Sequence, residues 1–171
     1  MEINVIGANG VENVREIFRM KVYAKVSIAG DPRTEQRTPV DKHGETNPAW
    51  NCIRNYTVSE SAVQQDGIML VIKLYCKRKL GDRYVGEVHA SIKELYELAS
   101  AKGGSFVLSS PVKRGFTESK GELTFSCRFG DIRTVEKPSL TDKMAVGGAR
   151  MLRLGALLFT IGAEIHDLFD G

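Results

Sequence analysis

Basic side chains gather in two short segments of this chain. Arg15, Arg19 and Lys21 lie in the first segment beside the apolar residues Ile17 and Phe18. Residues 76–83 form the second segment, in which four bases and one acid give a formal charge of +3. The bases of this second segment are Lys77, Arg78, Lys79 and Arg83, and Leu80 lies among them. Fixed cations interleaved with apolar side chains predict attraction to an anionic surface.

The residue types that usually bind metals or catalyse reactions are scattered. The cysteines are Cys52, Cys76 and Cys127, and the histidines are His43, His89 and His166. Neither set has the spacing of a zinc site or a disulfide framework, so we expect the cysteines to be small residues buried in or beside strands. The Gly-Gly pairs at 103–104 and 147–148 lack the context of a phosphate loop, and there is no G-x-S-x-G motif. We therefore predict no catalytic residues, no metal and no enzymatic activity.

Composition limits the kind of protein that this chain forms. Its 171 residues are 42% hydrophobic and 26% charged, with a formal net charge of +3. These values exclude a disordered chain, collagen, a coiled coil and a multi-domain enzyme. The charge is also too small for a dedicated duplex-binding protein, so nucleic acid is not an expected partner. The opening MEINVIGA is strand-like and unlike a signal peptide, from which we expect a reducing, cytoplasmic compartment.

Alternating apolar and polar residues dominate the first 130 positions. Val22, Ala24, Val26 and Ile28 occupy one side of a predicted strand, and its other side carries polar residues. We expect eight strands near 2–8, 21–29, 35–40, 50–57, 68–75, 84–91, 104–110 and 121–129, with one short helix over 91–98. Strands with one apolar face are typical of antiparallel sheets. The prediction is an all-β, eight-stranded antiparallel β-sandwich with a short inserted helix.

The pattern changes after Gly130. Residues 131–143 are polar and predict a linker, and residues 144–171 predict a hydrophobic, amphipathic C-terminal helix. The uncharged run from Leu154 to Ala163 is too short for a bilayer span, which needs ~20 residues. Gly148, Gly155 and Gly162 recur every seven residues and would allow close helix approach, so self-association through this helix is an alternative.

Residues 1–130 resemble a C2 domain. The resemblance rests on Asn47-Pro48-Ala49-Trp50-Asn51 followed, after about 35 residues, by Val85-Gly86-Glu87-Val88. The opening Glu2-Ile3-Asn4-Val5-Ile6 and the segment Val26 to Arg33 are similar to small single-C2 plant proteins of the cold-regulated, soybean-type group. The family implies a β-sandwich whose loops at one end meet membranes, usually through Ca²⁺ held by five aspartates. Trp50 is expected to pack on the sandwich at the start of a strand.

The positions that hold those aspartates in the family carry other residues in this chain. They correspond to Arg15, Lys21, Tyr75, Lys77 and Arg83; Asp82 stands beside the last of them, and Asn13 and Glu16 lie near the first. Ca²⁺ prefers 6–8 oxygen ligands, and cationic side chains would repel it. We therefore expect no cofactor, and in particular no Ca²⁺ site of the usual kind. The lipid-binding loops would instead use Arg15, Phe18, Arg19, Lys21, Lys77, Arg78, Lys79 and Arg83.

A second lipid site is implied by the resemblance. Some C2 domains bind phosphoinositide headgroups through a Tyr/Lys cluster on an outward strand face. Tyr23 and Lys25 match those positions, and Arg37 is expected on the neighbouring strand. The cations would donate charge-assisted hydrogen bonds to phosphate beside the tyrosine ring. Alternating lysines on an exposed strand are also an ordinary means of preventing edge aggregation, so both interpretations stay open.

The resemblance leads to one functional prediction and one alternative. The prediction is a peripheral module that binds anionic membrane lipids without Ca²⁺, in plant stress or defence signalling at the plasma membrane or endoplasmic reticulum. Its C-terminal helix would supply a second membrane contact. The alternative is a protein-interaction adaptor that uses this helix and the sandwich surface to bind a membrane or signalling protein.

Overall fold

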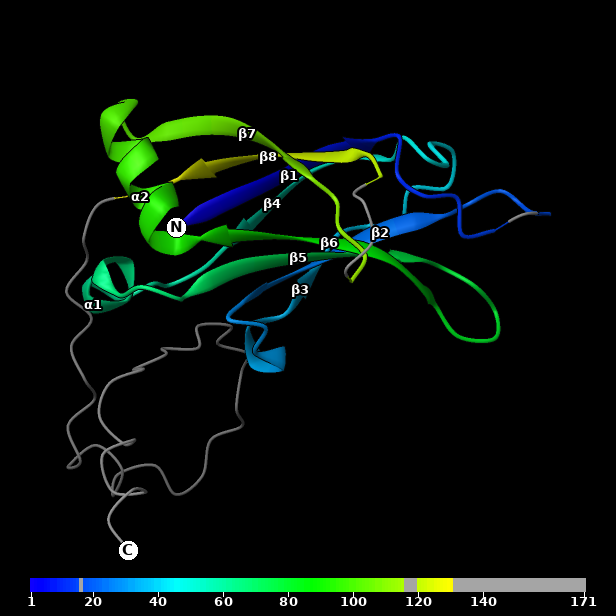
Figure 1. Ribbon diagram of the computed structural model, residues 1–171, viewed down its shortest axis with the longest axis horizontal. Coiled ribbons are helices and arrows are strands. Elements are labelled where there is room, and N and C mark those ends of the chain that lie inside the picture. The colour runs from blue at the N-terminus through cyan, green and yellow to red at the C-terminus, as the bar shows by residue number, and fades with distance from the viewer. Residues whose placement is uncertain (16, 116–119, 131–171) are drawn as a thin grey trace, which may run out of the picture.

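The computed structural model describes residues 1–15, 17–115 and 120–130. They form two four-stranded antiparallel sheets that pack face to face (Figure 1). The first sheet has the order β4 (Ala49–Asn55), β1 (Glu2–Asn9), β8 (Glu122–Arg128) and β7 (Ser105–Pro111). The second sheet has the order β3 (Gln36–Arg37), β2 (Val22–Ile28), β5 (Met69–Cys76) and β6 (Arg83–Ser91). The predicted eight-stranded sandwich is confirmed; the expected linker and C-terminal helix lie outside the described residues.

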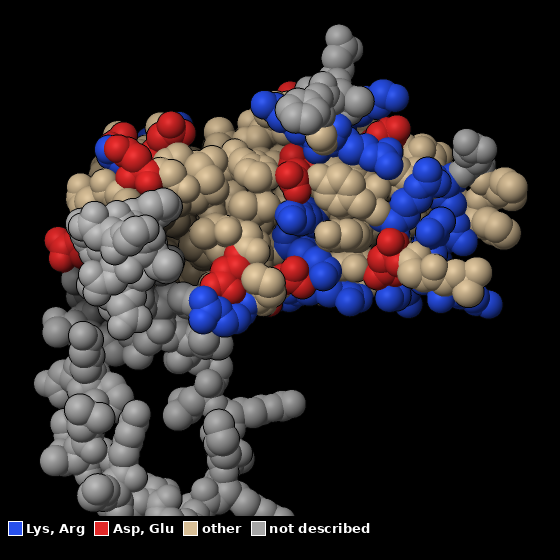
Figure 2. All heavy atoms as spheres, turned by 60° about the horizontal axis from the view of Figure 1, so that its bottom comes forward, with Lys and Arg blue, Asp and Glu red and all other residues tan. Residues whose placement is uncertain are grey.

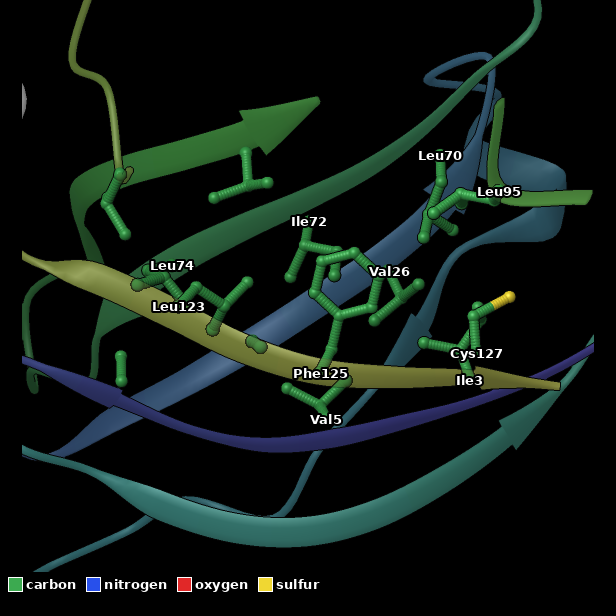
Figure 3. Packing of buried hydrophobic residues seen from close by; sticks show 14 of the residues in the cluster. Ile3, Val5, Val26, Leu70, Ile72, Leu74, Leu95, Leu123, Phe125 and Cys127 are labelled. Carbon is green, nitrogen blue, oxygen red and sulfur yellow. The ribbon is translucent and has the colours of Figure 1, made fainter. Parts of the chain in front are cut away.

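Apolar residues from alternate strand positions fill the space between the sheets. The ring of Phe125 lies at the centre of the core, and Val26 and Ile72 of the opposite sheet point toward it (Figure 3). All three side chains are inaccessible to solvent. Because burial contributes ~25 cal/mol per Å² of apolar surface, the alternating pattern fixes which face of each strand turns inward.

Within the described residues, three short helices join the strands. α2 (Ile92–Ala101) begins at Ser91, whose hydroxyl accepts a hydrogen bond from the Glu94 amide, and it buries Ile92, Leu95 and Ala99. It confirms the helix expected at 91–98. The 3₁₀ turn η1 (Pro32–Thr34) and helix α1 (Glu60–Gln64) were not expected from the sequence. Both are too short to show a helical apolar period.

β3 is shorter than the strand expected over 35–40. Its regular pairing ends after Arg37, because the Thr38 hydroxyl takes the place of a backbone acceptor for the Ala24 amide at 2.9 Å. The next residue is Pro39, which has no amide to donate. The cysteine expectation holds for Cys76 and Cys127, which are buried, whereas Cys52 on β4 is only half-buried.

Trp50 packs against the sandwich as expected. It is half-buried against the core, and its indole Nε1 donates to the Val22 carbonyl at 3.1 Å. Tyr56 makes a similar bond between the sheets, from its hydroxyl to the Val26 carbonyl at 2.9 Å. Burial raises the pKa of Tyr56 above its ordinary value. These two bonds hold β4, and the residue that follows it, against β2 of the other sheet.

Candidate membrane-facing loops

Four connecting segments meet at one end of the sandwich, which we call the loop pole. It consists of residues 10–21, 38–48, 77–82 and the described parts of 112–121, and it lies at the right in Figure 1. The register explains this meeting, because Val22 pairs with Cys76 and Asn9 pairs with Glu122. The strands of each antiparallel pair therefore enter and leave the sheet at the same end.

The two basic segments predicted from the sequence are in direct contact. The Lys77 amide donates to the Lys21 carbonyl at 2.7 Å, and the Arg83 guanidinium donates to the Val14 carbonyl at 2.8 Å. Arg83 thus serves mainly to hold the first segment against the second. The structure brings together the cations that are far apart in sequence, as the resemblance implied.

Asp82 organises the loop between β5 and β6. Its carboxylate accepts hydrogen bonds from the Tyr23 hydroxyl at 2.7 Å, from Lys77 Nζ at 3.2 Å and from the Arg78 amide at 3.1 Å. The hydrogen bond from Tyr23 is the main reason why the pKa of Asp82 lies below its ordinary value. Burial, followed by the same bond, raises the pKa of Tyr23 to about 12. Through these hydrogen bonds, the Asp82 carboxylate holds the loop in its conformation.

Apolar side chains project from the tips of both basic loops. The exposed fractions are 87% for Ile17, 66% for Phe18 and 96% for Leu80. The Arg15 guanidinium lies 4.8 Å from the centre of the Phe18 ring and donates to the Arg19 carbonyl at 3.3 Å. Arg15 therefore shapes the tip of the first loop as well as charging it.

The cations at the loop pole differ in how strongly they are paired. Arg19 forms an ion pair with Glu45 at 3.4 Å, and Lys77 forms one with Asp82 at 3.2 Å. The side chains of Lys21 and Lys79 are exposed and have no ion-pair or hydrogen-bond partner within the described part of the chain. On the face of the molecule seen in Figure 2, Lys and Arg side chains gather over the half that lies nearer the loop pole. The pole thus presents a cationic rim.

The segment 38–48 supports the loop pole and was not identified from the sequence. Asp41 accepts hydrogen bonds from the amides of His43 at 2.8 Å, Gly44 at 3.1 Å and Ala49 at 2.8 Å. Burial by itself raises the pKa of Asp41, but these amide donors outweigh burial and the pKa is lowered. The Asn47-Pro48 turn was the available signal, and the Asn47 side chain indeed accepts a hydrogen bond from the Gly10 amide at 2.8 Å.

The five positions at which the resemblance implies Ca²⁺ ligands carry side chains that are poor ligands for that ion. Four of them are Arg or Lys, and the fifth, Tyr75, stacks on Tyr23 with ring centres 5.7 Å apart. In residues 1–15, 17–115 and 120–130, no group of three or more His, Cys, Asp or Glu side chains is arranged to hold a metal. The donor chemistry at these positions disfavours a hard cation.

The second predicted site lies on the outward face of the second sheet, with a different geometry from the one expected. Tyr23 was expected on the outward strand face with its ring beside a phosphate, but only 2% of the residue is accessible. Its ring is covered by Tyr75 on one strand and by the Arg37 guanidinium, 4.1 Å from the ring centre, on the other. Lys25 lies 5.3 Å from the Tyr75 ring and pairs with Glu35 at 2.7 Å. The cations therefore stand over a tyrosine platform, which also includes Tyr84.

The helices of the described residues contain no segment long and apolar enough to span a bilayer. Within the described residues, cations gather on a preformed support at the loop pole and over the tyrosine platform.

Comparisons with known proteins agree with this architecture. Protein SRC2 of Glycine max is 37% identical over 133 residues, which are 77% of this chain and 46% of that protein. A homolog of SRC2 in Arabidopsis thaliana is 35% identical over 133 residues, 77% of this chain and 40% of that protein. The matched part of the chain thus spans less than half the length of both relatives.

A solved structure shows the same fold at lower identity. One C2 domain of plant extended synaptotagmin 1 superimposes with a TM-score of 0.59 at 16% identity, covering 76% of this chain and 95% of that domain. The sequence model of the C2 domain matches residues 1–108. With the sandwich, its loop pole and these matches together, the chain belongs to the C2 domain family.

Proposed function

We propose that this chain is a peripheral module that attaches to anionic phospholipid surfaces through its loop pole. The observation that carries the proposal is the exposure of Ile17, Phe18 and Leu80 at the loop tips among fixed cations. Large apolar side chains are rarely left almost fully exposed on a protein that has no partner for them. A bilayer interface offers an apolar layer beneath an anionic one, which matches both kinds of side chain.

The charge distribution orients the molecule toward such a surface. Residues 10–21 carry three bases and two acids, and residues 76–83 carry four bases and one acid, so their net charges of +1 and +3 together give +4. The whole chain carries +3, so the remainder is slightly negative. Each base near an anionic leaflet contributes ~1 kcal/mol, and salt screens this attraction beyond ~8 Å. The loop pole is therefore the end that approaches the bilayer.

We propose that this attachment does not require Ca²⁺. In a calcium-dependent arrangement the metal would supply the positive charge, whereas here Lys21, Lys77 and Arg83 occupy three of the expected ligand positions. Asp82 is engaged by Tyr23, Lys77 and the Arg78 amide. The charge at the rim is therefore permanent, and binding would respond to lipid composition and salt.

We further propose that Lys25 and Arg37 bind a phosphorylated headgroup above the tyrosine platform. The Arg37 guanidinium is exposed and held in place by the Tyr23 ring beneath it. A phosphate would compete with Glu35 for Lys25, so a doubly charged phosphate is favoured over a singly charged diester. Tyr23 would support the cations and would not itself contact the phosphate.

The biological setting is proposed from the plant relatives. The matched proteins come from soybean and Arabidopsis, which supports a plant protein. We propose that it acts at the cytoplasmic side of the plasma membrane or the endoplasmic reticulum. We propose a role in stress or defence signalling at such a membrane. We assign no catalytic activity to this module.

Co-sedimentation of the full chain with vesicles tests the proposal. Phosphatidylcholine vesicles with and without phosphatidylserine are compared, in EGTA and in Ca²⁺, at low and high salt. Binding is expected only with the anionic lipid, equally in EGTA and Ca²⁺, and weaker at high salt. Binding that requires Ca²⁺ would refute calcium independence, and binding to neutral vesicles alone would refute the electrostatic model.

A charge-reversed variant and a matched control locate the contact. The triple change Lys77→Glu, Arg78→Glu and Lys79→Glu is expected to abolish binding. The control, Lys93→Glu, Lys102→Glu and Arg128→Glu, changes net charge equally at the other end of the sandwich and is expected to bind like the wild type. Equal loss in both variants would show that net charge, and not the loop pole, is responsible.

A further inference from the structure

The outer edge of β7 differs from the other three sheet edges. A sheet edge presents unpaired amides and carbonyls, and proteins usually shorten, charge or cover it. β3 is only two residues long, and its Arg37 carbonyl accepts a hydrogen bond from Arg54. β6 carries charged residues and is met by Lys113, whose amide and carbonyl both bond to Glu87. These two edges are therefore protected.

β4 is also protected as an edge. It contains Asn51 at a φ of 45°, which interrupts its regular extended backbone, and the Gln36 side chain donates to the Asn55 carbonyl at 2.8 Å. β7, in contrast, reads Ser105-Phe106-Val107-Leu108-Ser109-Ser110-Pro111, without a single charge. Figure 1 shows it as the outermost strand of its sheet.

The register of β7 shows which of its backbone groups are unpaired. The Val112 amide donates to the Gly121 carbonyl at 3.0 Å, and the Phe129 amide donates to the Gly104 carbonyl at 3.2 Å. In an antiparallel pair, every second residue directs its backbone amide and carbonyl toward the partner strand, so positions 106, 108 and 110 bond to β8. Ser105, Val107 and Ser109 direct their backbone groups away from the sheet. These groups have no hydrogen-bond partner within the described part of the chain.

We propose that a second copy of this chain pairs with the outer edge of β7. A two-fold axis at Val107 would place the two β7 strands antiparallel, with Val107 opposite its counterpart and Ser105 opposite Ser109. The three residue pairs would form up to about six backbone hydrogen bonds and join the first sheets into one continuous sheet. Pro111, which lacks an amide, lies outside this pairing.

The properties of β7 favour an identical copy as its partner. An uncharged strand meets itself without like-charge repulsion, which would oppose self-pairing of a charged edge. Val107 is 60% exposed and would cover its own counterpart, while small serines face each other on both sides. The neighbouring outward residues Asn4 and Ser126 are uncharged as well, so no ionic contact has to be broken.

Sedimentation of the full chain over a wide concentration range tests this dimer. The wild type is expected to dimerise, and Val107→Pro, which removes one outward amide and no bond to β8, is expected to stay monomeric. Val107→Lys should also stay monomeric, whereas Ser126→Lys on the adjacent strand should still dimerise. Circular dichroism and thermal unfolding verify that each variant is folded. The Val107 amide of the wild type should gain protection from hydrogen exchange as concentration rises.

Three outcomes would overturn this assignment. A wild type that is monomeric at every concentration means that the edge accepts no second copy. A dimer that persists in both Val107 variants means that another segment, such as the C-terminal residues, forms the contact. A dimer lost only in Ser126→Lys means that the sheets stack by their faces.

The dimer has a consequence that rests on the proposed function. β7 ends at the loop pole, because Pro111 and Asn9 both pair with Glu122, so antiparallel pairing directs the two loop poles in opposite directions. One dimer would therefore contact two bilayers. Dynamic light scattering should show clustering of phosphatidylserine vesicles by the wild type and binding without clustering by Val107→Pro. Clustering by that variant would refute the two-sided arrangement, whereas absence of vesicle binding by both proteins would refute only the proposed function.

Discussion

Truncation of Leu80 to alanine separates the apolar part of the proposed membrane contact from the electrostatic part. The Leu80 side chain is 96% exposed in the isolated chain, so nearly all of its surface is available for transfer into a bilayer. The change removes about three carbon groups at ~0.8 kcal/mol each, which lowers the affinity by ~2.4 kcal/mol, or roughly 50-fold. The sandwich itself should keep its stability, because this side chain packs on nothing within the fold.

Lys79→Ala is the matched electrostatic variant on the adjacent residue. Its loss of ~1 kcal/mol corresponds to about fivefold weaker binding at low salt and less at high salt. Vesicle binding by both variants is measured at two salt concentrations. The Leu80→Ala effect should be the same at both, since transfer of an apolar side chain is not screened.

Ile53→Ala controls for the loss of any exposed apolar side chain. Ile53 is 50% exposed on β4, away from the loop pole, and its truncation should leave vesicle binding unchanged. Wild-type binding by Leu80→Ala would refute insertion of this side chain into the bilayer. A loss in Leu80→Ala that disappears at high salt would refute it equally, since the residue would then act only by positioning its charged neighbours.

Three further predictions concern hydrogen bonds that the fold provides. Tyr23→Phe removes the main donor to Asp82, so the pKa of Asp82 should rise, and a carboxyl ¹³C NMR titration that matches the wild type would contradict this. Tyr56→Phe leaves the Val26 carbonyl without its donor from the other sheet and should cost ~1 kcal/mol of unfolding free energy in urea, which an unchanged midpoint would disprove. The pKa of Asp41 is lower in the fold than in the unfolded chain, so its stabilising contribution is complete above about pH 4 and is lost as the pH falls through the folded-state pKa. Asp41→Asn should therefore lose stability less steeply than the wild type below about pH 4, and parallel pH profiles would argue against this role.

The strands and the basic loops were predictable because their signals are local. A period of two residues in apolar character requires only that neighbouring side chains point to opposite faces, which holds for every strand before it finds its partner. The expected strands therefore match the observed ones closely, apart from β3, where Thr38 and Pro39 end the ladder early. The exposure of the cations at 77–79 was likewise predictable, since a turn with several charges has few ways to bury them.

The tyrosine platform was only partly predictable. Alternation correctly placed Tyr23 on the outward face, but a residue directed outward is exposed only if its cross-strand neighbours leave it uncovered. Here Tyr75 and Arg37 lie beside it, and their identity as neighbours follows from the register of β2 with β5 and with β3. That register cannot be read from a single sequence, because it is set only when the strands pair.

By itself, the sequence determined the all-β character of this protein, the inward face of each strand and the supply of permanent charge in two turns, because these depend on residue type and on spacing along one strand. Only the tertiary structure decided which loops share a pole. It also decided that Asp82 accepts hydrogen bonds from Tyr23 and Lys77, and that the uncharged β7 lies at the edge of its sheet. Those features arise between residues that are distant in the chain, and the hydrogen-bond register that joins them is set when the two sheets close over a common core.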